Sequence, residues 1–150
     1  MKTHRGFTLL MSVLVASVML ALGYALYNIA VKELVLSSSG RESQFAFYAA
    51  DTGVECALYW DYNGDTFSTS SPLTEVACGV ATSTLTRNLT GSTYTTTFSF
   101  TQRSTAPSPC ISVIVTRDVT PRRTTIESSG YNTCDTANPF RIERAIRVTY

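Results

Sequence analysis

The sequence predicts an α+β fold in which the second half of one long amino-terminal helix packs on an antiparallel β-sheet of about four strands. Three patterns support this prediction. Residues 7–31 carry no formal charge, residues 41–60 repeat apolar side chains at helical spacing, and segments within 94–150 alternate apolar and polar side chains. We divide the chain into a leader (1–6), an apolar helix (7–31), an amphipathic continuation of that helix (32–62), a variable loop (63–93) and the sheet (94–150).

The uncharged run Phe7–Val31 is long enough to cross a membrane. A helix of this length extends about 37 Å at about 1.5 Å per residue, and a bilayer core is about 30 Å thick. Lys2 and Arg5 precede the run, and by the positive-inside rule they keep the amino terminus in the cytoplasm. Tyr24 and Tyr27 fit the aromatic belt at the far interface. We therefore expect a single-pass protein of the cytoplasmic membrane with an extracytoplasmic carboxy-terminal domain.

The stretch Arg5-Gly6-Phe7-Thr8-Leu9-Leu10 resembles the amino-terminal signal of type IV pilins and pseudopilins. In that family a prepilin peptidase cuts after the glycine and methylates the new amino-terminal phenylalanine. The resemblance implies cleavage between Gly6 and Phe7, N-methylation of Phe7 and a pilin fold. It also implies a structural role, in which the apolar helix joins other pilin subunits in an extracellular type IV pilus or a periplasmic pseudopilus like that of type II secretion.

Met11 departs from the usual pattern of the family. It stands at the fifth mature residue, where most members have a glutamate that is thought to pair with the amino terminus of a neighbouring subunit. A charge at that depth costs about 2.5–3.5 kcal/mol unless it has a partner. A chain without this glutamate resembles a minor subunit of the family, particularly a tip (K-type) pilin. Residues 42–57 also resemble the helix of X-type minor pilins.

The second half of the helix is expected to bend or hinge at Ser37–Gly40, because serine and glycine are mediocre to poor helix formers. Beyond this point one apolar stripe is expected to face the sheet. Its members are Phe47, Ala50, Val54, Ala57 and Leu58. The turn signal Asn63-Gly64 then ends the helix.

Residues 63–93 are rich in Ser, Thr and Gly and are expected to be irregular. Four strands should follow, at Tyr94–Phe100, Ile111–Val115, Thr124–Ser128 and Phe140–Tyr150, with turn-like residues at Gly130-Tyr131-Asn132. In the first strand one face carries Tyr94, Thr96, Phe98 and Phe100, and in the last one face carries Ile142, Ile146, Val148 and Tyr150. Short connections between these strands predict an antiparallel meander with one face against the helix.

Four cysteines, Cys56, Cys78, Cys110 and Cys134, follow the apolar run. No two of them form a C-x-x-C pair, and the chain has one histidine, His4 in the leader, so a zinc site is poorly supported. An even number of cysteines beyond a membrane anchor indicates two disulfides in an oxidising compartment. Three connectivities are open, and proximity in sequence favours Cys56–Cys78 with Cys110–Cys134.

Enzyme chemistry finds little support, and no cofactor is expected. Asp51-Thr52-Gly53 matches the aspartic-protease triplet, but that chemistry needs two carboxylates on loops, and this single triplet lies in a helical pattern. His4 lies in the leader, and the cysteines are explained as disulfides, so a nucleophile with its base is missing from the sequence.

Calcium is a weaker alternative at the turn that follows the helix. Asp61, Asn63 and Asp65 have the oxygen-ligand spacing that begins a calcium loop. An EF-hand would then need a glycine at Thr66 and a glutamate at Pro72, and it has neither. Some pseudopilins do bind calcium in their loops, which keeps this alternative open beside a plain turn.

Charge is distributed unevenly along the chain. Residues 32–75 hold two basic and seven acidic side chains, whereas residues 101–150 hold seven arginines and four acidic side chains. Three interpretations are open: the acidic and basic segments face each other within the domain, they face each other between copies, or both are solvated. Arg122, Arg123 and Arg141 are candidates for contact with DNA, but aromatic residues are sparse among them, which favours solvated or subunit-pairing charges.

The interpretation at this stage is a minor pilin or pseudopilin and not an enzyme. Two alternatives stay open. One is a minor pilin whose head binds DNA or a surface, and the other is an unrelated bitopic membrane protein with an extracytoplasmic domain.

Overall fold

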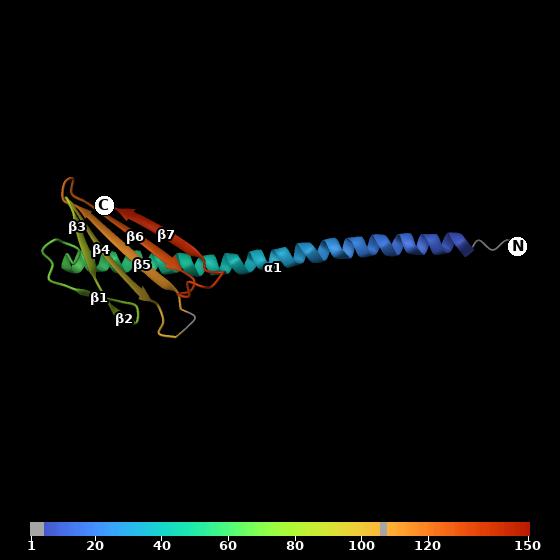
Figure 1. The fold of residues 1–150 in the computed structure, drawn as a ribbon, viewed down its shortest axis with the longest axis horizontal. Coiled ribbons are helices and arrows are strands. Elements are labelled where there is room, and N and C mark those ends of the chain that lie inside the picture. The colour runs from blue at the N-terminus through green and yellow to red at the C-terminus, as the bar shows by residue number, and fades with distance from the viewer. Residues whose placement is uncertain (1–4, 106–107) are drawn as a thin grey trace. The chain divides into compact units, whose positions relative to one another are not determined.

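The computed structural model describes residues 5–105 and 108–150. The protein has the predicted α+β architecture: one long helix, α1 (Arg5–Gly64), is followed by seven strands. The chain forms two compact units, Met1–Ser39 and Gly40–Tyr150. In the second unit the strands lie against the carboxy-terminal half of α1 (Figure 1).

The helix α1 continues without interruption through Ser37–Gly40, where the sequence predicts a bend or hinge. The hydroxyl of Ser39 donates a hydrogen bond to the carbonyl of Leu36 (2.9 Å), so the polar side chain is satisfied within the helix. Helix propagation adds one hydrogen bond for each residue that is fixed. A few weak helix formers in a long helix therefore lower its stability without ending it.

The strands form two antiparallel sheets. A two-stranded hairpin contains β1 (Glu75–Cys78) and β2 (Ala81–Thr84). A five-stranded sheet has the order β3-β4-β5-β6-β7. Its strands are β3 (Thr86–Thr90), β4 (Thr93–Thr101), β5 (Cys110–Asp118), β6 (Arg123–Tyr131) and β7 (Glu143–Thr149). Neighbours in the sheet are also neighbours in sequence, which is the predicted meander.

Residues 63–93 are less irregular than expected, since they contain β1, β2 and β3. The single large apolar residue of β3, Leu89, is exposed, so no alternation of apolar side chains marks this strand. The strand forms because its backbone pairs with β4 through a tight turn at Gly91, which has a φ of 62°. It adds a fifth strand at the edge of the sheet.

The core lies between the sheet and α1. Alternate side chains of the three central strands fill it from the sheet side, as the period of two predicts: Thr96, Phe98 and Phe100 of β4, Ile111, Val113 and Val115 of β5, and Ile126 and Ser128 of β6. From the helix side the buried residues are Ala46, Ala49, Ala50, Gly53, Val54 and Ala57. The expectation for Phe47 is wrong, since this side chain is 49% exposed, and Leu58 is half-buried.

Gly53 of α1 and Gly130 of β6 show that the helix and the sheet approach each other closely. A Cβ atom at Gly130 would lie 2.2 Å from the carbonyl oxygen of Ala46 and from the nitrogen of Ala50. A Cβ atom at Gly53 would lie 2.1 Å from the Oγ of Ser128. Gly130 was expected in a turn, but it lies within β6, where its missing side chain lets the helix approach the sheet.

Two disulfides join the elements of this unit. Cys56 of α1 pairs with Cys78 of β1, and Cys110 of β5 pairs with Cys134 in the β6–β7 loop. These are the pairs that proximity in sequence favours. The paired residues are 22 and 24 positions apart. Each bridge is worth about 3 kcal/mol in the chain-entropy model.

Candidate functional site

The apolar half of α1 is a candidate membrane and assembly segment. Among the residues that the structure describes, α1 is the one helix long and apolar enough to cross a membrane, judged by length and composition. Large apolar side chains all around this segment are exposed, from Phe7 to Val31. A helix that is apolar on every side needs a lipid or protein environment, because no polar face is left for water.

Three polar side chains in this segment form hydrogen bonds within the helix. Ser12 donates to the carbonyl of Leu9 and Ser17 to that of Leu14, both at 2.8 Å. Asn28 Nδ2 donates to the carbonyl of Tyr24 at 3.0 Å. Lipid offers no hydrogen-bond partners, so these internal bonds make the segment compatible with a hydrocarbon surrounding.

The expected processing site lies at the start of the helix. Gly6 and Phe7 follow Arg5 in the first turn of α1, and the ring of Phe7 is 67% exposed. Lys2 and His4 of the expected leader lie outside the described residues. One turn further along the helix, the side chain of Met11 is exposed.

A charged cluster at the end of α1 joins the helix to the sheet. Arg117 Nη2 of β5 donates to both carboxylate oxygens of Asp61, at 2.9 and 3.0 Å. Arg117 Nη1 donates to Asp65 Oδ1 at 2.6 Å, and Nε donates to the hydroxyl of Thr124 at 3.2 Å. The hydroxyl of Tyr150 donates to Asp61 Oδ2 at 2.5 Å. This cluster was not recognised from the sequence, because Arg117 and Asp61 are 56 residues apart.

The cluster changes the acidity of its members. The hydrogen bond from Arg117 lowers the pKa of Asp65 below its ordinary value. Burial raises the pKa of Tyr150 above its ordinary value, and the hydrogen bond to the Asp61 carboxylate raises it further. Partial burial lowers the pKa of Arg117, but its bonds to Asp65 and Asp61 outweigh this effect and leave the pKa raised. At neutral pH the arginine and Asp65 are therefore ionised and the phenol keeps its proton.

The three residues considered as calcium ligands lie in two environments, one beside Arg117 and one exposed. Asp61 and Asp65 both contact the guanidinium of Arg117, which already supplies positive charge to their carboxylates. Asn63 lies between them on the exposed side of the last helical turn. In the described residues, no three His, Cys, Asp or Glu side chains lie together in a way that could hold a metal ion.

The three arginines considered for DNA contact are not brought together. Arg122 and Arg123 lie at the β5–β6 turn, whereas the guanidinium of Arg141 lies 3.7 Å from the ring centroid of Tyr131. Arg123 and Tyr131 are the first and last residues of β6, so roughly 26 Å of extended chain separates them. These side chains do not form one basic strip.

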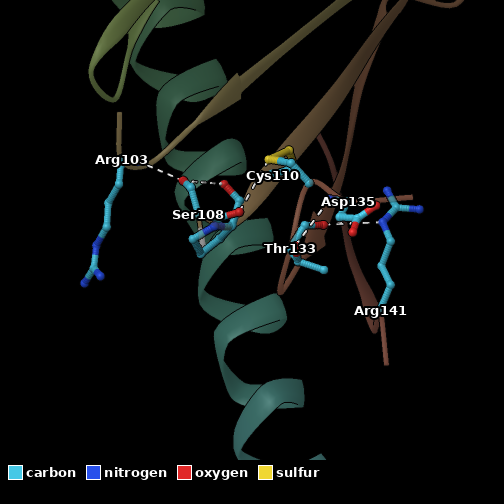
Figure 2. Close-up of a disulfide and its surroundings, with 8 residues drawn as sticks. Arg103, Ser108, Cys110, Thr133, Asp135 and Arg141 are labelled. Atoms are coloured by element: carbon cyan, nitrogen blue, oxygen red, sulfur yellow. Dashed lines mark hydrogen bonds between the residues drawn. A yellow bond between two sulfur atoms is a disulfide. The ribbon is translucent and has the colours of Figure 1, made fainter. Parts of the chain in front are cut away.

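Two further features surround the basic residues. Arg122 and Arg123 border a cleft of about 560 Å³ that also has Arg117 and Tyr150 in its wall. At the other end of the sheet, Figure 2 shows Arg141 beside the Cys110–Cys134 disulfide, where its Nε donates to the carbonyl of Thr133 at 3.4 Å. Arg141 therefore supports the β6–β7 loop and contacts Tyr131, and it is less available for a ligand than Arg122 and Arg123.

The Asp51-Thr52-Gly53 triplet lies within α1 and contributes to packing. Thr52 Oγ1 donates to the carbonyl of Tyr48 (2.8 Å) and accepts a hydrogen bond from Gln102 (2.9 Å). Gly53 is buried against β6. A triplet on a helix does not have the strand-to-loop setting of an aspartic-protease site.

An aromatic and acidic face of the second unit was also not recognised from the sequence. Tyr48, Asp51, Glu55 and Tyr59 lie three or four residues apart on α1, so they share one side of the helix. Tyr48 and Tyr59 are 63% and 61% exposed. Among the described residues, neither Asp51 nor Glu55 lies within 4.0 Å of a cationic group. We call these four residues the tyrosine–carboxylate face.

Comparisons of the chain with protein-family models, with curated proteins and with solved structures give no match.

Proposed function

We propose that the protein is a structural subunit of the minor class in a type IV pilus or a type II secretion-like pseudopilus. The observation that supports this proposal best is the Gly6-Phe7 pair at the start of a helix whose apolar side chains are exposed as far as Val31. The second half of the same helix carries a disulfide-bonded head. One continuous element can thus be held in a membrane and present a folded domain outside it.

Assembly would proceed by lateral packing of the apolar segment. Small residues let helix backbones approach closely, and in lipid such packing supplies much of the association energy. Ala16, Ser17, Ala21, Gly23 and Ala25 provide small positions within this stretch. A side chain at Gly23 would meet no atom of this chain within 4 Å, so its surface is open to a neighbour.

Met11 supports the minor class within this proposal. A neutral thioether avoids the electrostatic cost of a buried carboxylate, but it cannot form the ion pair that the carboxylate would make. The subunit would therefore enter a filament without the pairing that most family members make at this position. Such a subunit fits the tip or an accessory position better than the repeating body.

Mass spectrometry of the mature amino terminus tests the proposal. The chain should be isolated from a cell that contains a prepilin peptidase, with a Gly6→Val variant as the matched control. We expect the native chain to begin at N-methylated Phe7 and the variant to keep residues 1–6. An intact Met1 in the native chain, or cleavage near Ala25, would contradict the pilin assignment and favour an unrelated bitopic protein or a secreted domain.

A further inference from the structure

We propose that the tyrosine–carboxylate face of α1 binds the Arg122-Arg123 turn of a second copy of this chain. The two surfaces lie on different elements, since one is a helix face and the other is the β5–β6 turn. The inference concerns the heads alone and does not rest on the proposed pilin function.

The first argument is the composition of the face. Tyrosine is enriched at protein interfaces because its ring covers a large area and its hydroxyl can still bond to water or to a partner. Tyr48 and Tyr59 lie on either side of Asp51 and Glu55, and both rings are more than half exposed. A helix face that served only for solvation would not need two exposed rings around unpaired carboxylates.

The second argument is charge complementarity. Arg122 and Arg123 are exposed, and among the described residues no carboxylate lies within 4.0 Å of either guanidinium. Asp51 and Glu55 are one helical turn apart, with Cβ atoms about 5–6 Å from each other. Adjacent arginines can present two guanidinium groups at a comparable spacing. Arg122 contributes to lowering the pKa of Asp65 by its charge, but in the described part of the chain it forms no ion pair within 4.0 Å. Each of the two surfaces thus carries two charges without an ion-pair partner, of the sign that the other lacks.

The third argument is that this chain already makes both kinds of contact internally. Arg117 binds the carboxylates of Asp61 and Asp65, and the guanidinium of Arg141 lies 3.7 Å from the ring centroid of Tyr131. An arginine that reaches the proposed face from a second copy would find a carboxylate and an aromatic ring together. A guanidinium in such a setting can form both a cation–π contact and a charge-assisted hydrogen bond.

The proposed contact is heterologous, because each copy would use a different patch toward each neighbour. In a pair of copies joined in this way, one face and one turn are bound, and the other face and the other turn stay free. It would also act between heads, independently of the apolar segment.

Site-specific photo-crosslinking of the full chain in its membrane tests this inference. The photoreactive residue p-benzoyl-phenylalanine replaces Tyr59, and in the control it replaces Leu89, which is 66% exposed on β3. We expect the probe at position 59 to link to a second copy within Val119–Arg123. The probe at position 89 should give no such product.

Charge exchange then distinguishes a specific ion contact from mere proximity. Asp51→Arg with Glu55→Arg, or Arg122→Glu with Arg123→Glu, should each lower the cross-link yield by about tenfold or more. A chain with all four substitutions should recover to within about twofold of the native yield. Reversal of two exposed charges elsewhere, Glu75→Arg and Arg103→Glu, should leave the yield unchanged.

Three results would overturn the inference. They are an unchanged yield in either reversed chain, no recovery in the fourfold variant whose disulfides and thermal unfolding match the native chain, or a cross-link from position 59 to a different protein. None of them would bear on cleavage at Gly6, which mass spectrometry of the same samples reports separately.

Discussion

Arg117 Nη2 on β5 lies 2.9 and 3.0 Å from the two carboxylate oxygens of Asp61 on α1. The Asp61 side chain is 7% exposed and that of Arg117 is 21% exposed, so this ion pair is shielded from water far more than a typical surface pair. It fixes the last turns of the helix on the central strand of the sheet. Removal of either partner leaves the other charge largely buried and with less compensation.

We predict that Asp61→Asn lowers the free energy of unfolding by about 2 kcal/mol. The amide keeps the size of the side chain but removes the charge that Arg117 and Tyr150 contact. Chemical denaturation of the detergent-solubilised chain measures the change. Glu75→Gln, at an exposed residue, is the control and should stay within about 0.5 kcal/mol of the native chain. Equal stability of the two variants would show that the cluster adds nothing.

From the raised pKa of Tyr150 we predict a loss of stability at alkaline pH. Its pKa is raised from the ordinary value of 10.0 by burial and by the hydrogen bond to Asp61. The unfolded chain releases this proton first, so the contribution of the phenol is fully present below pH 10 and declines above it. Tyr150→Phe should be less stable at neutral pH by about 1 kcal/mol and should lose less on going to alkaline pH. Parallel pH profiles for the two chains would contradict this assignment.

From the lowered pKa of Asp65 we predict a loss of stability in acid. The hydrogen bond from Arg117 lowers the pKa of Asp65 from 3.8 in the folded state, so the unfolded chain binds a proton at a higher pH. The contribution of Asp65 is therefore present at neutral pH and declines as the pH falls through and below 3.8. Because this carboxylate is mostly exposed, the effect is modest and screened by salt. Asp65→Asn should give a shallower decline in acid titrations followed by circular dichroism, and the difference should shrink at high ionic strength.

Gly130→Ala should be strongly destabilising, by about 3 kcal/mol, because the added methyl group would meet the backbone of α1. Gly40→Ala is the matched control, since nothing lies within 4 Å of a Cβ atom there. In that position alanine favours the helix by about 1 kcal/mol. Thermal unfolding of the two variants should therefore shift in opposite directions. A native-like melting temperature for Gly130→Ala would mean that the sheet can withdraw from the helix at little cost.

The sequence predicts the elements whose side chains follow a clear period. Phe98 and Phe100 alternate with polar neighbours and are buried as expected, and the apolar run indicates the first half of α1. The prediction that Phe47 faces the sheet is wrong, because helical periodicity identifies an apolar side chain without showing how close the sheet comes to the helix. That separation is set by Gly130, whose absent side chain is more often associated with turns than with strands.

The candidate sites show the same division between local and long-range information. Gly6-Phe7 is a contiguous motif and can be read directly from the sequence. The Arg117–Asp61 pair joins positions 56 residues apart, and Asp61 alone suggested a turn or a calcium ligand. Arg87 is similar, because its guanidinium donates to the carbonyls of Thr66 and Ser71, at 3.0 Å each, and backbone acceptors leave no trace in a sequence.

The attachment of α1 to the sheet has a mechanical consequence. Asn132 and Arg144 bond to Glu42 and Ser43 near the start of the head, at 3.1 and 2.8 Å. The Cys56–Cys78 bridge and the Arg117 ion pairs follow further along the helix. A pulling force on α1 is therefore shared among attachments along the head, one of them covalent. Tension on α1 therefore reaches β1, β5 and β7 through separate contacts.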